Sequence, residues 1–305
     1  MSLLEVCRLT KCYAKKTAAV ENLTLSVQQG QIFGFLGPNG SGKTTTLGLI
    51  FGVITPTHGT ISVFGGTNRQ ALRQGRMSGT LEQPNLYPYL TGRENLKVVA
   101  AIKGLDAKFI QPALATVDML EVAGRTVKSY SLGMKQRLAL AAAILGEPEL
   151  LLLDEPTNGL DPEGMREVRD LLIKLSASGR TILISTHLLD EVEKVCTHVA
   201  VMNKGRLQRS GPVGEFTGAT AIYRLSAANV SELRDAVGQY ELARNIRVVG
   251  EVLYAELRSG TPALLNRYLA ERGIYLNELC HQRQTMEQAF LTLTASESDV
   301  TGQGV

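Results

Sequence analysis

Apolar and polar residues alternate along the first part of the chain in patterns that predict short strands and helices. Asn22–Gln28 has an apolar residue at every second position, which predicts a strand with one buried face. Gln31–Leu36 is a short apolar run and predicts a second strand. A glycine-rich loop follows it, and the segment from Lys43 to about Phe51 is predicted to be a helix that ends at Gly52.

Further along, the pattern indicates a buried parallel sheet. Leu150–Leu153 is apolar at every position, as expected for a strand in the middle of such a sheet. Asp161 and Pro162 are typical of a helix start, because aspartate caps a helix and proline suits its first turn. Since strands and helices alternate, we predict an α/β core. The other elements predicted here are the strands Thr60–Phe64 and Thr181–Ser185, the helices Arg93–Ile102, Leu138–Leu145 and Leu189–Cys196, and the hairpin Val199–Gln208.

A change of composition divides the chain. Gly211–Thr220 is rich in glycine and small polar residues, so we predict a domain boundary there. Residues 1–217 then form the first domain, with a mainly helical part at about 84–146, residues 220–294 form a small α+β domain, and residues 295–305 form a polar tail. The elements predicted for the second domain are the strands Ala221–Leu225, Ile246–Leu257 and Ile274–Gln282, and the helices Val230–Val237, Thr261–Arg272 and Met286–Thr294.

Composition and charge exclude several classes of protein. The 305 residues are 44% hydrophobic, which is ordinary for a globular protein. With 32 basic and 29 acidic residues the net charge is only +3, so no nucleic-acid partner is expected. The four cysteines form no CxxC pair and are interpreted as reduced thiols of a cytosolic protein. No apolar run approaches the roughly 20 residues that cross a bilayer, so any membrane function needs another polypeptide to span it.

The loop after the second strand matches a phosphate-binding motif in every required position. The chain from Gly37 to Thr44 reads G-P-N-G-S-G-K-T, between a predicted strand and a predicted helix. Glycines let the backbone N–H groups point at phosphate oxygens, Lys43 would reach the β- and γ-phosphates, and the Thr44 hydroxyl would bind Mg²⁺. The alternative is a chance glycine-rich turn. The residues expected to bind the nucleotide are Gly37, Pro38, Asn39, Gly40, Ser41, Gly42, Lys43, Thr44 and Thr45.

Two carboxylates follow the apolar strand 150–153. The end of that strand delivers Asp154 and Glu155 to the edge of the sheet where the phosphate loop lies. Asp154 is the candidate Mg²⁺ partner, through a water molecule or from just outside the ion's direct ligands, and Glu155 is the candidate general base for the attacking water. His187 follows the strand Thr181–Ser185 and could contact the γ-phosphate. The alternatives are a core strand with a solvated end, and a capping or surface histidine.

The segment from Tyr130 to Arg137 resembles a sequence motif of a known protein family. It reads Y-S-L-G-M-K-Q-R, and with the phosphate loop, Asp154-Glu155, Gly159-Leu160-Asp161 and His187 it is similar to the ordered motif set of ABC ATPases over residues 4–217. The resemblance implies a P-loop NTPase core with an antiparallel β subdomain and a helical subdomain, followed by the small C-terminal α+β domain. It also implies ATP and Mg²⁺ as cofactors.

The same resemblance implies a head-to-tail homodimer that holds two ATP molecules at its interface. Each ATP would contact the phosphate loop of one subunit and Ser131 and Gly133 of the other, where a helix N-terminus suits a phosphate. Asp161 would lie at the dimer interface. Tyr13 would stack on adenine, although a packed core tyrosine is the alternative.

Two departures from the family pattern change the expected chemistry. Leu132 and Met134 replace a glycine and a glutamine of the usual signature L-S-G-G-Q, whereas Ser131 and Gly133 are kept. Glu82, followed by Gln83, stands where most members have a glutamine that binds Mg²⁺, and its carboxylate is an acceptable ligand.

These two features are similar to ATPases that export bacitracin-like and lantibiotic peptides. The expected function is ATP hydrolysis that powers export of a drug, peptide antibiotic or similar amphipathic substrate through a separately encoded permease, on the cytoplasmic side of the membrane. An importer ATPase or a nucleotide-dependent regulator remains an alternative. The C-terminal domain resembles one that many bacterial export ATPases carry, with a role in dimer stabilisation, regulation or simple coverage of an apolar edge.

Overall fold

A computed structural model describes residues 2–13, 18–81, 85–217, 221–257, 262–282 and 285–295. The chain forms two compact units. One consists of the residues up to Val213 together with the end of the last helix from Leu293, and the other of Gly214–Thr292. None of the helices in the described ranges is long and apolar enough to cross a membrane.

The first unit is built on a six-stranded sheet with the strand order β5-β6-β7-β3-β8-β9. All neighbours run parallel except β9, which pairs antiparallel with β8. Every residue of β3, β6 and β7 is buried, which explains their nearly continuous apolar sequences. The strands are β3 (Ile32–Leu36), β5 (Met77–Thr80), β6 (Leu150–Asp154), β7 (Thr181–Thr186), β8 (His198–Asn203) and β9 (Arg206–Pro212).

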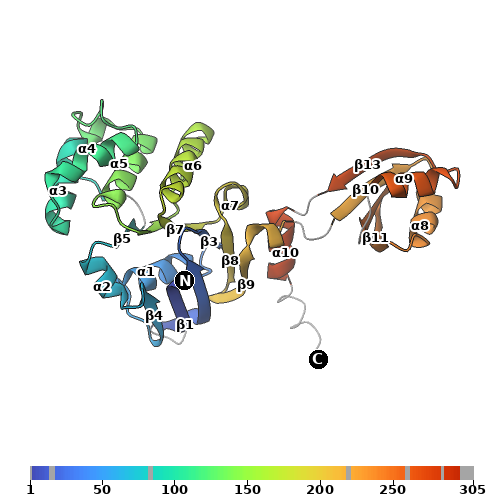
Figure 1. The fold of residues 1–305 in the computed structure, drawn as a ribbon, viewed down its shortest axis with the longest axis horizontal. Coiled ribbons are helices and arrows are strands. Elements are labelled where there is room, and N and C mark those ends of the chain that lie inside the picture. Colours follow the sequence, from blue (N-terminus) through green and yellow to red (C-terminus); the bar gives the residue numbers. More distant parts are fainter. Residues whose placement is uncertain are drawn as a thin grey trace. The chain divides into compact units, whose positions relative to one another are not determined.

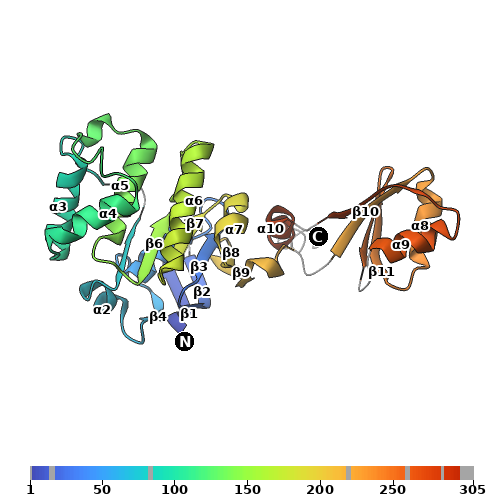
Figure 2. The same cartoon turned by 45° about the horizontal axis from the view of Figure 1, so that its top comes forward.

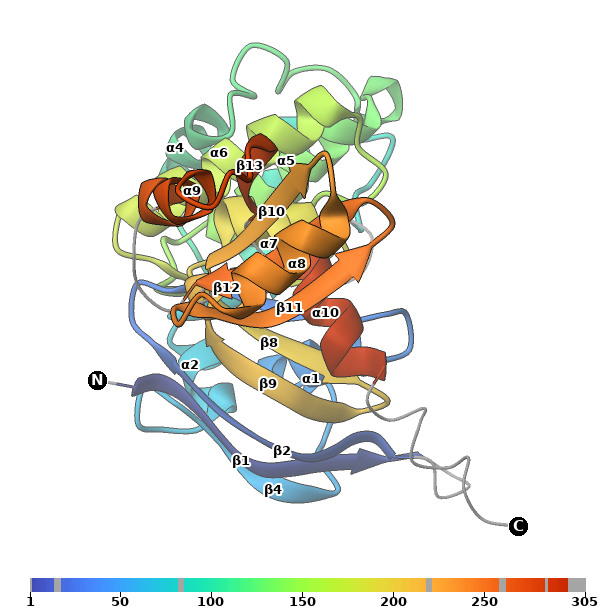
Figure 3. The same ribbon diagram turned by 90° about the vertical axis from the view of Figure 1, so that its right-hand side faces the viewer.

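A second sheet of three antiparallel strands has the order β2-β1-β4. Helix α1 contributes Leu47 and Ile50 to a core that also holds Leu4 of this sheet and Leu152 of β6. Strand β2 runs beside the hairpin of β8 and β9 (Figure 3), and the Glu21 N–H donates to the carbonyl of Gly205 at 2.8 Å. The elements are β1 (Ser2–Cys12), β2 (Ala18–Gln28), β4 (His58–Val63) and α1 (Lys43–Phe51).

Helices α3, α4 and α5 lie together in a helical lobe (Figure 1). Thr91 and Glu94 form a capping box at the start of α3, and Gly104 ends this helix with φ 66°. Ser131 caps the start of α5. Helices α6 and α7 lie beside β7 and β3 (Figure 2). The helices are α2 (Asn68–Arg73), α3 (Gly92–Lys103), α4 (Ile110–Thr116), α5 (Leu132–Ile144), α6 (Pro162–Ala177) and α7 (Leu189–Val195), with 3₁₀ turns at Ala107–Phe109, Val127–Ser129 and Val213–Glu215.

The second unit contains a four-stranded antiparallel sheet with the order β11-β12-β10-β13. Helices α8 and α9 lie on one side of this sheet (Figures 1 and 2), and Leu225, Leu233, Leu253 and Leu265 are fully buried in its core. The elements are β10 (Ala221–Ala227), α8 (Val230–Gly238), β11 (Ala243–Val249), β12 (Val252–Leu257), α9 (Pro262–Ala270) and β13 (Leu276–Gln282), followed by α10 (Met286–Ala295).

The prediction of one strand over Ile246–Leu257 is wrong. The segment is a hairpin, in which β11 pairs antiparallel with β12 and Val249 lies opposite Val252. Gly250 turns the chain with φ 61°, a conformation that glycine adopts without strain. The apolar residues on both sides of this glycine concealed the turn in the sequence.

Candidate functional site

The phosphate loop lies between β3 and α1, at the carboxyl edge of the parallel sheet. Gly40 and Gly42 have φ of 80° and 101°, which only glycine adopts easily. A Cβ on Gly37 would lie 2.4 Å from the Met202 carbonyl oxygen, and one on Gly42 would lie 2.4 Å from the Ala19 carbonyl oxygen. The loop is therefore pressed against β8 and β2, and these two positions require glycine for reasons of space.

The ammonium of Lys43 lies inside this loop. Its Nζ donates to the carbonyl of Gly37 at 2.8 Å and to that of Pro38 at 3.3 Å, and the side chain is buried. Burial lowers the pKa of Lys43, and the nearby carboxylates of Glu155 and Asp154 partly oppose this effect. The buried Ser41 hydroxyl has no hydrogen-bond partner among the described residues. The loop thus presents a cation and an orphaned donor, as a phosphate group requires.

Asp154 ends β6 and is held by two hydroxyl groups. Thr44 Oγ1 donates to Asp154 Oδ1 at 3.1 Å, and Ser185 Oγ donates to the same oxygen. Asp154 and Ser185 lie side by side in the parallel pairing of β6 with β7. This carboxylate is buried and fixed in orientation beside the first turn of α1.

Glu155 has a strained backbone conformation, and its carboxylate lies between Lys43 and His187. Its φ is 48°, which is unusual for a residue other than glycine. Its N–H donates to Ser185 Oγ at 3.1 Å. One carboxylate oxygen lies 3.8 Å from Lys43 Nζ, and the other lies 3.0 Å from His187 Nδ1. The carboxylate and the imidazole are therefore within hydrogen-bond distance of each other.

These residues fit a magnesium ion that arrives with a nucleotide. The Thr44 hydroxyl and the Asp154 carboxylate are hard oxygen donors beside the phosphate loop, and Mg²⁺ typically takes one or two protein oxygens together with phosphate oxygens and waters. Binding of Mg²⁺ by Thr44 and Asp154 stays a prediction. Glu82, the third expected metal ligand, lies outside the described residues.

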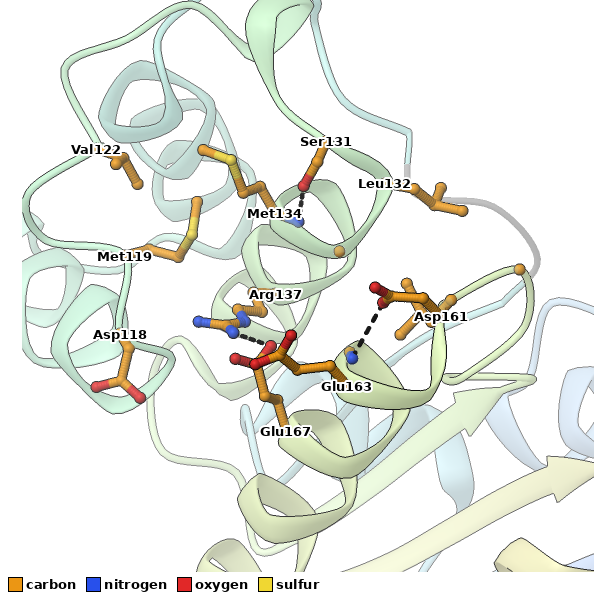
Figure 4. A pocket seen from close by; sticks show the side chains of 14 residues that line it. Asp118, Met119, Val122, Ser131, Leu132, Met134, Arg137, Asp161, Glu163 and Glu167 are labelled. Atoms are coloured by element: carbon orange, nitrogen blue, oxygen red, sulfur yellow. Dashed lines mark hydrogen bonds and ion pairs between the residues drawn. The ribbon is translucent and has the colours of Figure 1, made fainter.

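A second group of candidate residues lines a hollow between α5 and the start of α6 (Figure 4), with a cavity volume of about 670 Å³. Ser131 Oγ accepts the N–H of Met134 at 3.2 Å, and Asp161 Oδ1 accepts the N–H of Gly164 at 3.1 Å. Arg137 and Glu167 form an ion pair inside the hollow. Among the described side chains, no hydrogen bond or ion pair joins this group to Lys43, Asp154 or Glu155.

Gly133 stands in the first turn of α5 without any need for glycine in its own chain. A Cβ built there would meet nothing closer than the Ser131 hydroxyl at 3.9 Å and Leu160 at 4.0 Å. This is the opposite of Gly37 and Gly42, which neighbouring backbone atoms force to be glycine.

Comparison with known proteins identifies the chain. The family model described as "ABC transporter" matches residues 20–158. The bacitracin transport ATP-binding protein BcrA of Bacillus licheniformis is 37% identical, over 96% of this chain and 97% of its own. The lantibiotic transport ATP-binding protein SrtF of Streptococcus pyogenes is also 37% identical, over 67% of this chain and 89% of its own. The chain belongs to the ABC transporter family.

The fold agrees with this assignment. A solved bacterial ABC transporter cassette, described as a dimer, is 25% identical and superimposes with a TM-score of 0.62 over 68% of this chain and 98% of its own. The present chain is therefore an ABC ATPase with a P-loop NTPase core, an antiparallel β subdomain, a helical lobe and an additional C-terminal α+β unit. It binds and hydrolyses ATP.

The other residues predicted to bind the nucleotide of this ABC ATPase differ in their exposure. Tyr13 follows β1 and is half-exposed, with Lys11 Nζ 5.1 Å from the centre of its ring, so it is not a packed core residue. Thr45 is half-buried in the first turn of α1, and Asn39 is exposed at the tip of the loop. Stacking of Tyr13 on adenine stays a prediction.

Sequence reasoning missed Ser185 as a member of the site. This residue appeared only as the end of a predicted strand. The available signal was the parallel pairing of two buried strands, which sets Ser185, the last residue but one of β7, beside Asp154, the last residue of β6. A hydroxyl at that register position is a natural partner for a buried carboxylate.

We predict that Ser185→Ala destabilises the ABC ATPase. Removal of the hydroxyl takes one hydrogen bond from the buried Asp154 carboxylate and another from the Glu155 N–H, so the free energy of unfolding should fall by about 1–3 kcal/mol. Urea denaturation measures this change. Ser210→Ala, at an exposed position of β9, is the matched control and should leave stability within about 0.5 kcal/mol. Equal stabilities of the two variants would contradict the role given to Ser185.

Proposed function

We propose that this ABC ATPase powers export through a separately encoded membrane permease and works as a homodimer with ATP and Mg²⁺ at its interface. The observation that carries the proposal is the separation of the site into two groups. Lys43, Thr44, Asp154, Glu155 and His187 gather around the phosphate loop, whereas Ser131 and Gly133 lie in another part of the chain. A second copy in head-to-tail orientation supplies the missing group to each nucleotide.

The residues around the phosphate loop have distinct roles in this proposal. The loop amides and Lys43 hold the β- and γ-phosphates, and Thr44 and Asp154 hold Mg²⁺, which when bound neutralises phosphate charge. Glu155 accepts the proton of the attacking water, and its strained backbone directs the carboxylate toward the nucleotide. His187 is bonded to Glu155 and orients it against the γ-phosphate.

The start of α5 completes the site from the partner subunit. Ser131 and the N-terminal amides of this helix suit the γ-phosphate, because helix N-termini carry partial positive charge. The open space at Gly133 supports this role. A glycine that its own chain does not require is explained if a phosphate of the opposite subunit's ATP approaches the backbone there. Asp161 lies on the same face of the molecule, in the hollow of Figure 4.

The names of two relatives support the cargo class. BcrA is named for bacitracin transport and SrtF for lantibiotic transport, and both cargoes are peptide antibiotics. We propose a peptide antibiotic or a similar amphipathic compound as cargo. The chain would then lie at the cytoplasmic face of the membrane, with the segment before α3 against the permease. Tyr87 and Tyr89 in this segment are 55% and 81% exposed, as a docking surface requires.

The variant Gly133→Ala tests whether glycine is needed at this position for ATP turnover by the dimer rather than for stability of the fold. Because alanine is a better helix former and finds open space here, we predict a protein that is stable or more stable by about 0.5–1 kcal/mol. Its ATP turnover should nevertheless fall by about a hundredfold, since a methyl group displaces the opposite subunit's nucleotide. Gly124→Ala, also in open space but not among the residues that line the hollow, is the control and should keep full turnover. Normal turnover in Gly133→Ala would remove the support for the shared site.

Mixing two inactive variants tests the head-to-tail dimer. Lys43→Met and Ser131→Ala should each abolish turnover, because every site of either homodimer contains one defect. A mixed dimer has one intact site, so an equal mixture should recover roughly a quarter of wild-type activity. In the control, Lys43→Met is mixed with the double variant carrying both changes, and no activity should return. A failure of the first mixture to recover would exclude the proposed arrangement.

Export is tested in cells that are sensitive to bacitracin and to a lantibiotic. When the chain is expressed together with its proposed permease, inhibition of growth should require a higher concentration of at least one of these peptides. Glu155→Gln removes the proposed base while keeping the shape of the side chain, so it should lose this protection. Unchanged sensitivity to both peptides would leave the ATPase assignment intact and refute the cargo class.

A further inference from the structure

Lys103, the last residue of α3, connects three elements of the helical lobe and the central sheet. Although the residue as a whole is exposed, its ammonium contacts buried groups of the neighbouring elements. Nζ donates to the buried Ser78 hydroxyl on β5 at 2.8 Å and to the Ala142 carbonyl of α5 at 2.7 Å. Further contacts at 3.4 Å and 3.3 Å reach the carbonyls of Ala143 and Leu145. One cation therefore joins α3, α5 and β5.

A cation is favourable at the C-terminal end of α5. The last four carbonyl groups of a helix have no partners inside the helix, and together they form its negative end. After Leu145, Gly146 turns the chain with φ 88°, and the helix cannot continue. Burial lowers the pKa of Lys103 to about 8, so the ammonium is still mostly charged at neutral pH.

The other end of the same helix is Ser131. Helix α5 has 13 residues and packs on β5, so it acts as a rod of about 20 Å whose two ends move together. Its middle is tied to α6 by the ion pair of Arg137 with Glu167, which is partly exposed and contributes little on its own. Besides the packing of α5 on β5, the bonds of Lys103 to Ser78 and to the Ala142 carbonyl connect the far end of the rod to the central sheet.

We propose that Lys103 is a positioning residue for ATP hydrolysis, which ties the C-terminal end of α5 to β5 and thereby holds Ser131 in place for the partner's nucleotide. The proposal rests on the role given to Ser131 above. Lys103 itself touches no nucleotide. Loss of its ammonium therefore leaves ATP binding to the phosphate loop unchanged. It lowers the rate of ATP hydrolysis, the step that needs both subunits.

Lys103→Met tests the proposal, because methionine keeps most of the side-chain length and removes the charge and the donors. We expect ATP affinity within about twofold of wild type and a kcat lower by about tenfold, because the start of α5 is then held less firmly for the step that needs both subunits. Lys103→Arg, which keeps charge and donors, should retain more turnover than Lys103→Met. Lys97→Met, at an exposed position of the same helix, is the matched control and should behave as wild type. A kcat of Lys103→Met equal to that of Lys97→Met would overturn the proposal.

Ser78→Ala gives a second measurement in case Lys103→Met does not fold. It removes only the hydroxyl on β5 and leaves the cation on the carbonyls of α5. A lower kcat with unchanged ATP affinity and unchanged melting temperature supports the positioning role. Unchanged kcat, or a loss of ATP affinity equal to the loss of kcat, refutes it. Ser131→Ala separates this inference from the proposed function, because normal turnover in that variant refutes the shared site itself.

Discussion

The close contact of the phosphate loop with the backbone of its neighbours is the constraint on which the rest of the site depends. Met202 of β8 and Ala19 of β2 place carbonyl oxygens where a Cβ of Gly37 or Gly42 would be. The loop is therefore packed at the place where the central sheet and the antiparallel sheet meet. This junction fixes the position of Lys43, and the Glu155 carboxylate lies near the Lys43 ammonium.

The acidic residues are positioned by the register of two parallel strands. Because Asp154 pairs with Ser185, one hydroxyl reaches both the Asp154 carboxylate and the Glu155 N–H. The backbone of Glu155 turns into a conformation with φ 48°, which the surrounding hydrogen bonds hold at an energetic cost. The same turn brings its carboxylate within 3.0 Å of His187, which follows the neighbouring strand. Strand order, rather than any local motif, unites these groups.

This explains how much the sequence could predict. The glycine-rich loop between a strand and a helix, the buried strand 150–153 and the start of α6 at Asp161 were predicted correctly, because each depends on residues close together in the chain. Ser185 and Lys103 were missed because their partners lie on strands or helices far away in sequence. The hairpin at Gly250 was missed because apolar residues continue on both sides of the turn. The C-terminal unit shows the same limit, since its strand order is visible only in three dimensions.

Glycine can be required for two different reasons that look alike in a sequence: by contacts within its own chain, or by a ligand from outside it. Gly37 and Gly42 are required by atoms of their own chain, so their substitution would disturb the fold. Gly133 has open space around it and helical backbone, so the fold would accept, and even favour, an alanine. A residue that lowers helix stability and solves no problem within its own subunit indicates that something outside the subunit needs the space. In the proposed dimer of this ABC ATPase, a nucleotide bound to a second copy would fill this space, since the negative charge of its phosphates suits the N-terminal end of α5.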